Sequence, residues 1–111
     1  MLRAWGDAFM VTMAVEVPIV CLAFRRLPLR TRMLAAVVAS GVSHPVMWLT
    51  LPRTEPYFVA ASIAEVFIVL FEAVVYRAFV RGCYSWWYAL VVSAAANATS
   101  CLVGLLLMVL E

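Results

Sequence analysis

Residues 57–80 read YFVAASIAEVFIVLFEAVVYRAFV, an apolar stretch that carries two acidic residues, Glu65 and Glu72, in its interior. A transmembrane helix takes about 17–25 residues, so this stretch is long enough to cross a bilayer. Three further apolar stretches of similar length lie along the chain, at about 8–24, 33–51 and 85–110. The sequence therefore predicts an all-α, integral membrane protein with four transmembrane helices.

The composition supports a membrane protein. The chain has 111 residues, of which 68% are hydrophobic and 13% are charged. Soluble domains are about 45–50% apolar and about 25% charged. A soluble chain this short buries only about 60–70% of the surface that it exposes when unfolded, so the remaining apolar surface requires lipid. We expect the lipid bilayer as a partner and no nucleic acid, because the arginines form no long basic run.

The three connections between these stretches are short, which predicts that successive helices pack as antiparallel neighbours. The first connection is rich in arginine, the second contains Pro52 and Pro56, and the third is centred on Gly82. Two prolines in a short connection end one helix and begin the next. The sequence thus predicts a single membrane domain over residues 1–111, folded as an antiparallel four-helix bundle.

Arginines are distributed unevenly over the two sides of the predicted bundle. Those beside the first and third connections are Arg25, Arg26, Arg30, Arg32, Arg77 and Arg81. Only Arg3 and Arg53 lie on the other side. Because positively charged residues stay in the cytoplasm, we expect a multi-pass protein with both termini outside, in a bacterial inner membrane.

Each predicted helix carries a polar residue at membrane depth: Glu16, His44, Glu65 and Asn97, in chain order. A charged side chain at the helix centre costs at least about 2.5–3.5 kcal/mol, so these side chains should face the interior. With a rise of about 1.5 Å per residue, Glu16 and Glu65 lie about 12 Å, and His44 about 10 Å, from the outer helix ends. We therefore expect Glu16, His44 and Glu65 in one site, with Asn97 lining it.

A proton or divalent-cation site used in transport or sensing is the first functional hypothesis. Intramembrane glutamates and histidines form proton pathways, and imidazole with carboxylates also suits first-row metal ions. The expected metal ligands are His44, Glu16 and Glu65, with a divalent metal ion as cofactor. A proton path would run through Glu65, Glu72 and Tyr76, because Glu72 returns to the face of Glu65 two turns later.

An intramembrane hydrolase is the second hypothesis, with Glu16, Glu65, His44 and Asn97 as candidate catalytic residues. A buried glutamate would activate water, while histidine or asparagine would stabilise the oxyanion. Glu72 with Arg77, His44 and Asn97 resembles the Glu, Arg, His and Asn set of the CAAX-protease family of membrane glutamic proteases. The chain lacks that family's paired glutamates and has about half its helices, so the family is not assigned.

Two further interpretations involve no chemistry at the polar residues. The first is a structural or assembly subunit of a larger membrane complex, because four helices enclose little interior. Such a subunit would form a homo-oligomer or bind a membrane-protein partner. The second is mutual neutralisation, in which protonated glutamates hydrogen-bond to His44 or Asn97 and serve only the packing of the helices.

Overall fold

The computed structural model describes residues 2–50, 57–80 and 82–110. Within these residues the chain forms four helices and no strand. The helices are α1 (Leu2–Ala23), α2 (Leu29–Thr50), α3 (Tyr57–Phe79) and α4 (Trp86–Leu110). The all-helical class and the four predicted helices are confirmed. The predicted proline-rich connection, together with Arg53 and Arg81 of the arginine pattern, lies outside the described residues.

The first two helices begin earlier than their apolar stretches do. α1 begins at Leu2 rather than near residue 8, and α2 begins at Leu29 rather than near residue 33. The amide of Arg32 donates to the Pro28 carbonyl at 3.1 Å, which closes the first turn of α2. Proline is tolerated at a helix start and arginine is a good helix former, so the helix extends into the arginine-rich segment.

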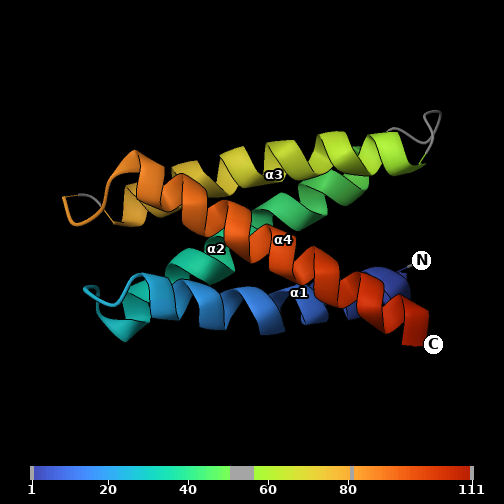
Figure 1. The fold of residues 1–111 in the computed structure, drawn as a ribbon, viewed down its shortest axis with the longest axis horizontal. Coiled ribbons are helices and arrows are strands. Elements are labelled where there is room, and N and C mark those ends of the chain that lie inside the picture. Colours follow the sequence, from blue (N-terminus) through green and yellow to red (C-terminus); the bar gives the residue numbers. More distant parts are fainter. Residues whose placement is uncertain (1, 51–56, 81, 111) are drawn as a thin grey trace.

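Successive helices run antiparallel, and each helix packs against two others (Figure 1). α1 and α3 lie on opposite sides of the bundle, while α2 and α4 cross between them at opposite faces. The end that carries the α1–α2 and α3–α4 connections is called the connection end. The opposite end, where α1 begins and α4 ends, is called the terminal end.

An apolar core fills the interior near the connection end. Phe24 and Tyr76 are fully buried there, with their ring centroids 5.6 Å apart in an edge-to-face arrangement. Tyr84 and Tyr88, from the α3–α4 connection and α4, also pack edge-on against Phe24, with centroids at 5.2 and 5.8 Å. Buried alanines at positions 35, 36, 39 and 89 join this cluster and let the helices approach closely.

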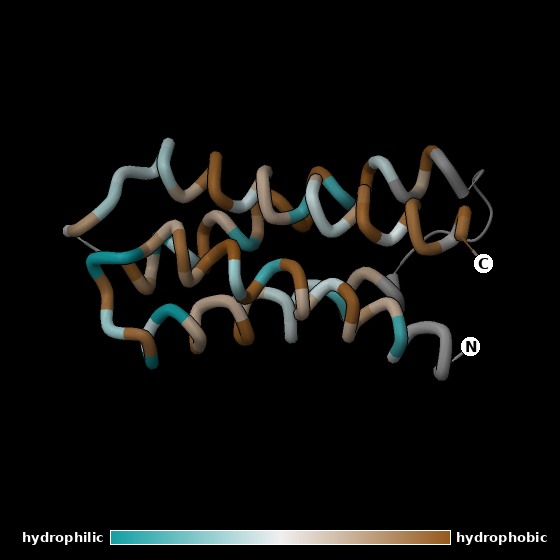
Figure 2. The backbone as a smooth tube through the Cα atoms, turned by 60° about the horizontal axis from the view of Figure 1, so that its bottom comes forward, coloured by the Kyte–Doolittle hydropathy of each residue, from teal (hydrophilic) through white to brown (hydrophobic). Residues whose placement is uncertain are grey.

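Two helices are long and apolar enough to cross a membrane, α1 over Gly6–Ala23 and α4 over Trp86–Leu107. Arginines near the start of α2 and glutamates within α3 interrupt the apolar character of the other two helices. Figure 2 shows hydrophilic positions scattered along otherwise hydrophobic helices. The outer surface is rich in large apolar side chains, such as Phe67 at 69% exposure. Glu16 and Glu72, in contrast, are fully buried inside the bundle.

Candidate functional site

A group of polar side chains is buried in the middle of the bundle. Its members among the described residues are Glu16, Ser40, Ser43, His44, Glu72, Ser93 and Asn97. All four helices contribute to it. The three α2 residues share one helix face because residues three and four positions apart lie above one another. Residues far apart in the sequence thus form one continuous polar interior.

Two glutamates form the centre of this interior. Glu16 on α1 and Glu72 on α3 are both fully buried. Each lies seven residues before the last residue of its helix, Ala23 for α1 and Phe79 for α3. These two helices run in the same direction, so both carboxyl groups lie about 10 Å from the connection-end termini of their helices.

The Glu16 carboxyl accepts hydrogen bonds from two helices. The Ser40 hydroxyl of α2 donates to Oε2. The Ser100 hydroxyl of α4 donates to Oε1 at 3.4 Å, and it also donates to the Asn97 carbonyl at 3.0 Å. One hydroxyl hydrogen cannot serve both acceptors fully, so Ser40 is the principal donor to Glu16.

The Glu72 carboxyl is held in the same way by neighbouring residues of the same two helices. The Ser43 hydroxyl of α2 donates to Oε1 at 2.9 Å, and Asn97 Nδ2 of α4 donates to Oε2 at 2.9 Å. The Tyr76 hydroxyl, one turn further along α3, lies 3.5 Å from Oε2. Asn97 is itself fixed, because its second amide hydrogen bonds to the Ser93 carbonyl at 2.9 Å. Glu72 is therefore the more firmly held of the two carboxyls.

His44 is the third ionisable member of the group. Its side chain is 8% exposed, and its ring lies edge-on to Phe9 with centroids 6.0 Å apart. Nε2 is buried and has no hydrogen-bond partner among the residues that the structure describes. One ring nitrogen of His44 and one carboxylate oxygen each of Glu16 and Glu72 lie within 4.8 Å of one another. The three side chains thus bring three potential metal-ligand atoms close together.

The structure brings the predicted site residues together, except that Glu72 takes the place predicted for Glu65. Glu16 and His44 lie in this group, and Asn97 lines it as a donor to Glu72. Glu65 is only half-buried and lies outside the group, in which Glu72 takes the place expected for it. The depth count assumed that α1 begins near residue 8. Because α1 begins at Leu2, Glu16 lies two turns deeper and level with Glu72.

Serine donors are the part of the site that the metal-ligand hypothesis did not include. Ser40, Ser43 and Ser100 supply three of the hydrogen bonds to the two carboxyls. The sequence signal for them is their spacing. Ser40 lies four residues before His44, and Ser100 lies three residues after Asn97, so each shares a helix face with a predicted site residue.

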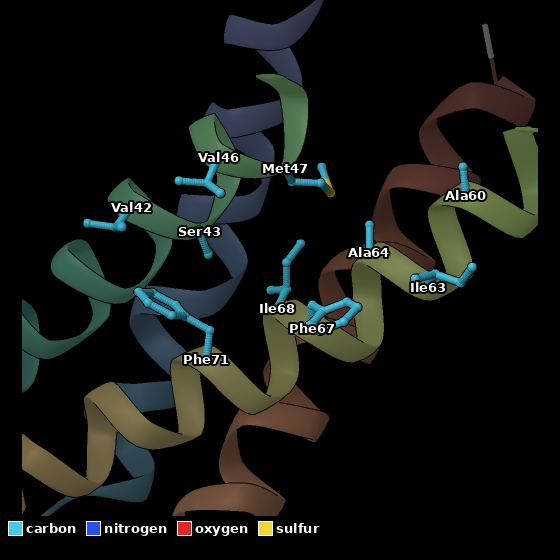
Figure 3. Close-up of a pocket in the computed structure, with 10 residues that line it drawn as sticks. All are labelled: Val42, Ser43, Val46, Met47, Ala60, Ile63, Ala64, Phe67, Ile68 and Phe71. Atoms are coloured by element: carbon cyan, nitrogen blue, oxygen red, sulfur yellow. The ribbon is translucent and has the colours of Figure 1, made fainter. Parts of the chain in front are cut away.

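The surroundings of the site differ from side to side. Towards the connection end, Tyr76 and Phe24 close the interior with buried rings. Sideways, an apolar groove of about 460 Å³ runs between α2 and α3 (Figure 3). Ser43 lies on this groove among apolar residues such as Met47, Ile68 and Phe71, and its hydroxyl also donates to Glu72. The groove therefore reaches the polar interior through one serine.

The two buried carboxyl groups, Glu16 and Glu72, lack a positively charged partner among the described residues. Within the part of the chain that the structure describes, no arginine pairs with either buried carboxyl. An unpaired carboxylate is costly in an apolar medium, and two of them close together are costlier still. The site must therefore be neutralised by protons or by a bound cation.

Comparisons with known proteins give no relative from which a function could be transferred. No protein-family model matches the chain, and no curated protein or solved structure matches it either. The chemistry of the site therefore rests on its own residues.

Proposed function

We propose that this chain is a four-span membrane protein that binds a divalent first-row metal ion, in exchange for protons, at Glu16, His44 and Glu72. The distribution of side chains supports the membrane location. Large apolar residues cover the outside of all four helices, whereas carboxyl, imidazole and amide groups occupy the inside. Lipid chains accommodate such a surface, and water does not. The orientation with both termini outside follows from the excess of arginines at the connection end.

The observation that carries the metal site is the convergence of three buried ligand atoms within 4.8 Å. Around a tetrahedral ion with bonds of about 2.0–2.2 Å, the ligand atoms lie about 3.3–3.6 Å apart, so side-chain rotations that close the group by about 1 Å would let all three bind one ion. The unpartnered Nε2 of His44 supplies a second argument, because buried polar atoms usually have partners. Imidazole with carboxylates favours zinc, manganese, cobalt or iron over magnesium or calcium.

Charge balance links the metal ion to protons. Two buried carboxylates beside a neutral imidazole carry two negative charges, which either two protons or one divalent cation neutralises. Binding of the ion requires deprotonated ligands and therefore releases protons. A site that alternates between these two neutral states exchanges two protons for one divalent ion. This exchange is the chemistry that either a transporter or a sensor of the ion would use.

Access to the site is proposed from the terminal end. The aromatic core at Phe24 and Tyr76 closes the opposite side. Glu65 lies on α3 two turns from Glu72 towards the terminal end, and it is half-buried. It is therefore placed to attract a cation before the ion reaches the buried group, without being one of the three ligands.

The proposal is tested by calorimetric titration of Zn²⁺ into the detergent-purified protein. Glu16→Gln, His44→Gln and Glu72→Gln should each weaken binding by at least about a hundredfold, because a direct ligand contributes more than its supporting shell. Glu65→Gln is the matched control, since it removes a carboxyl from the same helix outside the group. It should change the equilibrium affinity by less than about tenfold. Helix content measured by circular dichroism verifies that each variant is folded.

Two outcomes contradict the proposal. Failure of the folded wild-type protein to bind Zn²⁺, Mn²⁺ or Co²⁺ would remove the metal site. A loss of affinity in Glu65→Gln as large as that in Glu72→Gln would move the site to the terminal half of α3.

An intramembrane hydrolase is the second candidate, and the groove between α2 and α3 favours it. A hydrolase acting on a membrane substrate needs a lateral opening to the lipid and a carboxyl that can serve as a general base. The groove supplies the opening, and Ser43 connects it to Glu72 (Figure 3). With nitrophenyl esters of fatty acids as substrates, turnover that is lost in both Glu72→Gln and Ser43→Ala would support this candidate. Absence of turnover by the wild-type protein would remove it for ester substrates.

A further inference from the structure

The connection end carries positive charge without any acidic counterpart. Its described arginines are Arg25, Arg26, Arg30, Arg32 and Arg77. The sequence has no aspartate or glutamate between residues 17 and 54, or between residues 73 and 110. Neither the α1–α2 connection nor the α3–α4 connection therefore offers an intramolecular carboxylate to these guanidinium groups.

Two of these arginines are half-buried and engaged by the protein itself. Arg32 donates through Nη1 to the Cys21 carbonyl at 2.6 Å. The guanidinium of Arg77 lies over the Trp86 ring, 5.6 Å from its centroid. Arg25, Arg26 and Arg30, in contrast, have exposed side chains. The arginines at this end therefore differ in their availability to an external anion.

Arg25 and Arg26 line a cleft of about 560 Å³ together with Tyr84 and Tyr88. The two tyrosine rings stack with centroids 4.7 Å apart, and the Arg26 guanidinium lies 5.9 Å from the Tyr84 centroid. The Tyr84 hydroxyl accepts the Arg26 amide at 3.0 Å, and the Tyr88 hydroxyl donates to the Ala23 carbonyl. These contacts fix one wall of the cleft relative to the arginines.

We infer that this cleft binds the phosphate headgroup of an anionic phospholipid. Arginine pairs geometrically with phosphate oxygens, and uncompensated arginines beside a membrane attract anionic lipids. Leu22, which is 62% exposed, lines the same cleft and continues the apolar outer face of α1. Trp86 and Trp87 are exposed at this end, as is typical of residues at headgroup level. A phosphate with attached acyl chains therefore fits the cleft better than free phosphate does.

This inference rests on the proposed membrane location and not on the cation site. The experiment is native mass spectrometry of the detergent-purified protein, titrated with dioleoyl phosphatidylglycerol or with dioleoyl phosphatidylcholine. The two lipids share their acyl chains and differ in net charge. The double variant Arg25→Gln/Arg26→Gln is compared with Arg30→Gln, which removes an exposed arginine of the same end outside the cleft. Detergent extraction of the protein from alkali-washed membranes reports the membrane location separately.

The wild-type protein should retain phosphatidylglycerol in preference to phosphatidylcholine. The double variant should lose about thirtyfold in affinity for phosphatidylglycerol, at about 1 kcal/mol for each arginine that contacts the phosphate. Arg30→Gln, which lies outside the cleft, should lose less than about twofold. Arg25→Gln alone should lose about fivefold, and it leaves the packing of Arg26 on Tyr84 intact. Equal retention of both lipids would overturn the inference. So would a loss in Arg30→Gln as large as in Arg25→Gln, or displacement of the lipid by equimolar inorganic phosphate.

Discussion

Glu16 and Glu72 occupy equivalent positions on opposite sides of the bundle, and the same two helices hold both carboxyls. α2 donates through Ser40 to Glu16 and through Ser43 to Glu72. α4 donates through Ser100 to Glu16 and through Asn97 to Glu72. The donors on each helix are three residues apart, which is the spacing of neighbours on one helix face. The polar network therefore ties all four helices together at one level.

Removal of one donor should loosen one carboxyl without unfolding the protein. Ser43→Ala should lower the free energy of unfolding by about 0.6 kcal/mol, the average for hydrogen bonds between membrane helices, and by no more than about 1.7 kcal/mol. It should also weaken Zn²⁺ binding by about tenfold, because Glu72 loses a partner that orients it. Unfolding in sodium dodecyl sulfate, followed by circular dichroism, measures the first effect, and calorimetry measures the second.

Thr99→Ala provides the control for this prediction. The Thr99 hydroxyl is exposed and donates to the Ala95 carbonyl of its own helix, so its loss should leave both quantities unchanged. Equal effects of Ser43→Ala and Thr99→Ala would show that the Ser43–Glu72 contact contributes nothing specific.

Zinc binding should weaken as the pH falls. Each carboxyl must lose its proton before it can coordinate the ion, so protons and metal compete for the same oxygens. The logarithm of the association constant should therefore rise with pH, with a slope that approaches two over the range in which both carboxyls are protonated and the His44 imidazole is neutral. Glu72→Gln removes one of the competing protons and should limit the slope to about one. Calorimetry in two buffers of different ionisation enthalpy counts the released protons, and a pH-independent affinity would contradict the exchange.

Metal binding should also stabilise the fold selectively. Zn²⁺ at about 100 times its dissociation constant should raise the free energy of unfolding by about 2.7 kcal/mol, because it binds the folded state. Addition of a chelator should reverse the effect. Mg²⁺ at the same concentration should not stabilise the protein, because it prefers all-oxygen sites over a site that contains His44. Equal stabilisation by Mg²⁺ and Zn²⁺ would show that the imidazole does not participate.

The sequence was sufficient to predict the helices and the burial of most of their central polar residues. The cost of polar groups in lipid predicts an interior position for Glu16, His44 and Asn97, and the structure buries all three. The sequence placed Glu65 in the site instead of Glu72 because the prediction assumed that α1 begins near residue 8 rather than at Leu2. Arg3 and Asp7 interrupt the apolar pattern there, whereas helix geometry depends on the backbone and continues through them. An error in the predicted end of a helix therefore shifts the estimated depth of every residue that is counted from it.

The packing of the site was beyond a sequence argument. Helical spacing indicates which residues share a face, but it does not indicate how far each helix is shifted along its neighbour. The pairing of Ser40 with Glu16 and of Ser43 with Glu72 depends on that shift, and on the oblique crossing of α2 (Figure 1). Closure of the connection end by Phe24 likewise depends on tyrosines from a distant part of the chain.

The membrane orientation can be read out with a native cysteine. Cys83 is exposed in the α3–α4 connection, at the arginine-rich end that the proposal places in the cytoplasm. A membrane-impermeant maleimide should therefore leave Cys83 unlabelled in intact cells and label it in inverted membrane vesicles. Cys101 lies exposed beside Leu102 on α4, so lipid should shield it in both preparations. Cys21 is half-buried within the apolar span of α1 and should be shielded likewise. The variant Cys83→Ser should accordingly remain unlabelled throughout, and Leu2→Cys in that background should be labelled in intact cells. Labelling of Cys83 in intact cells would reverse the orientation, because it would place the arginine-rich connections outside and both termini in the cytoplasm.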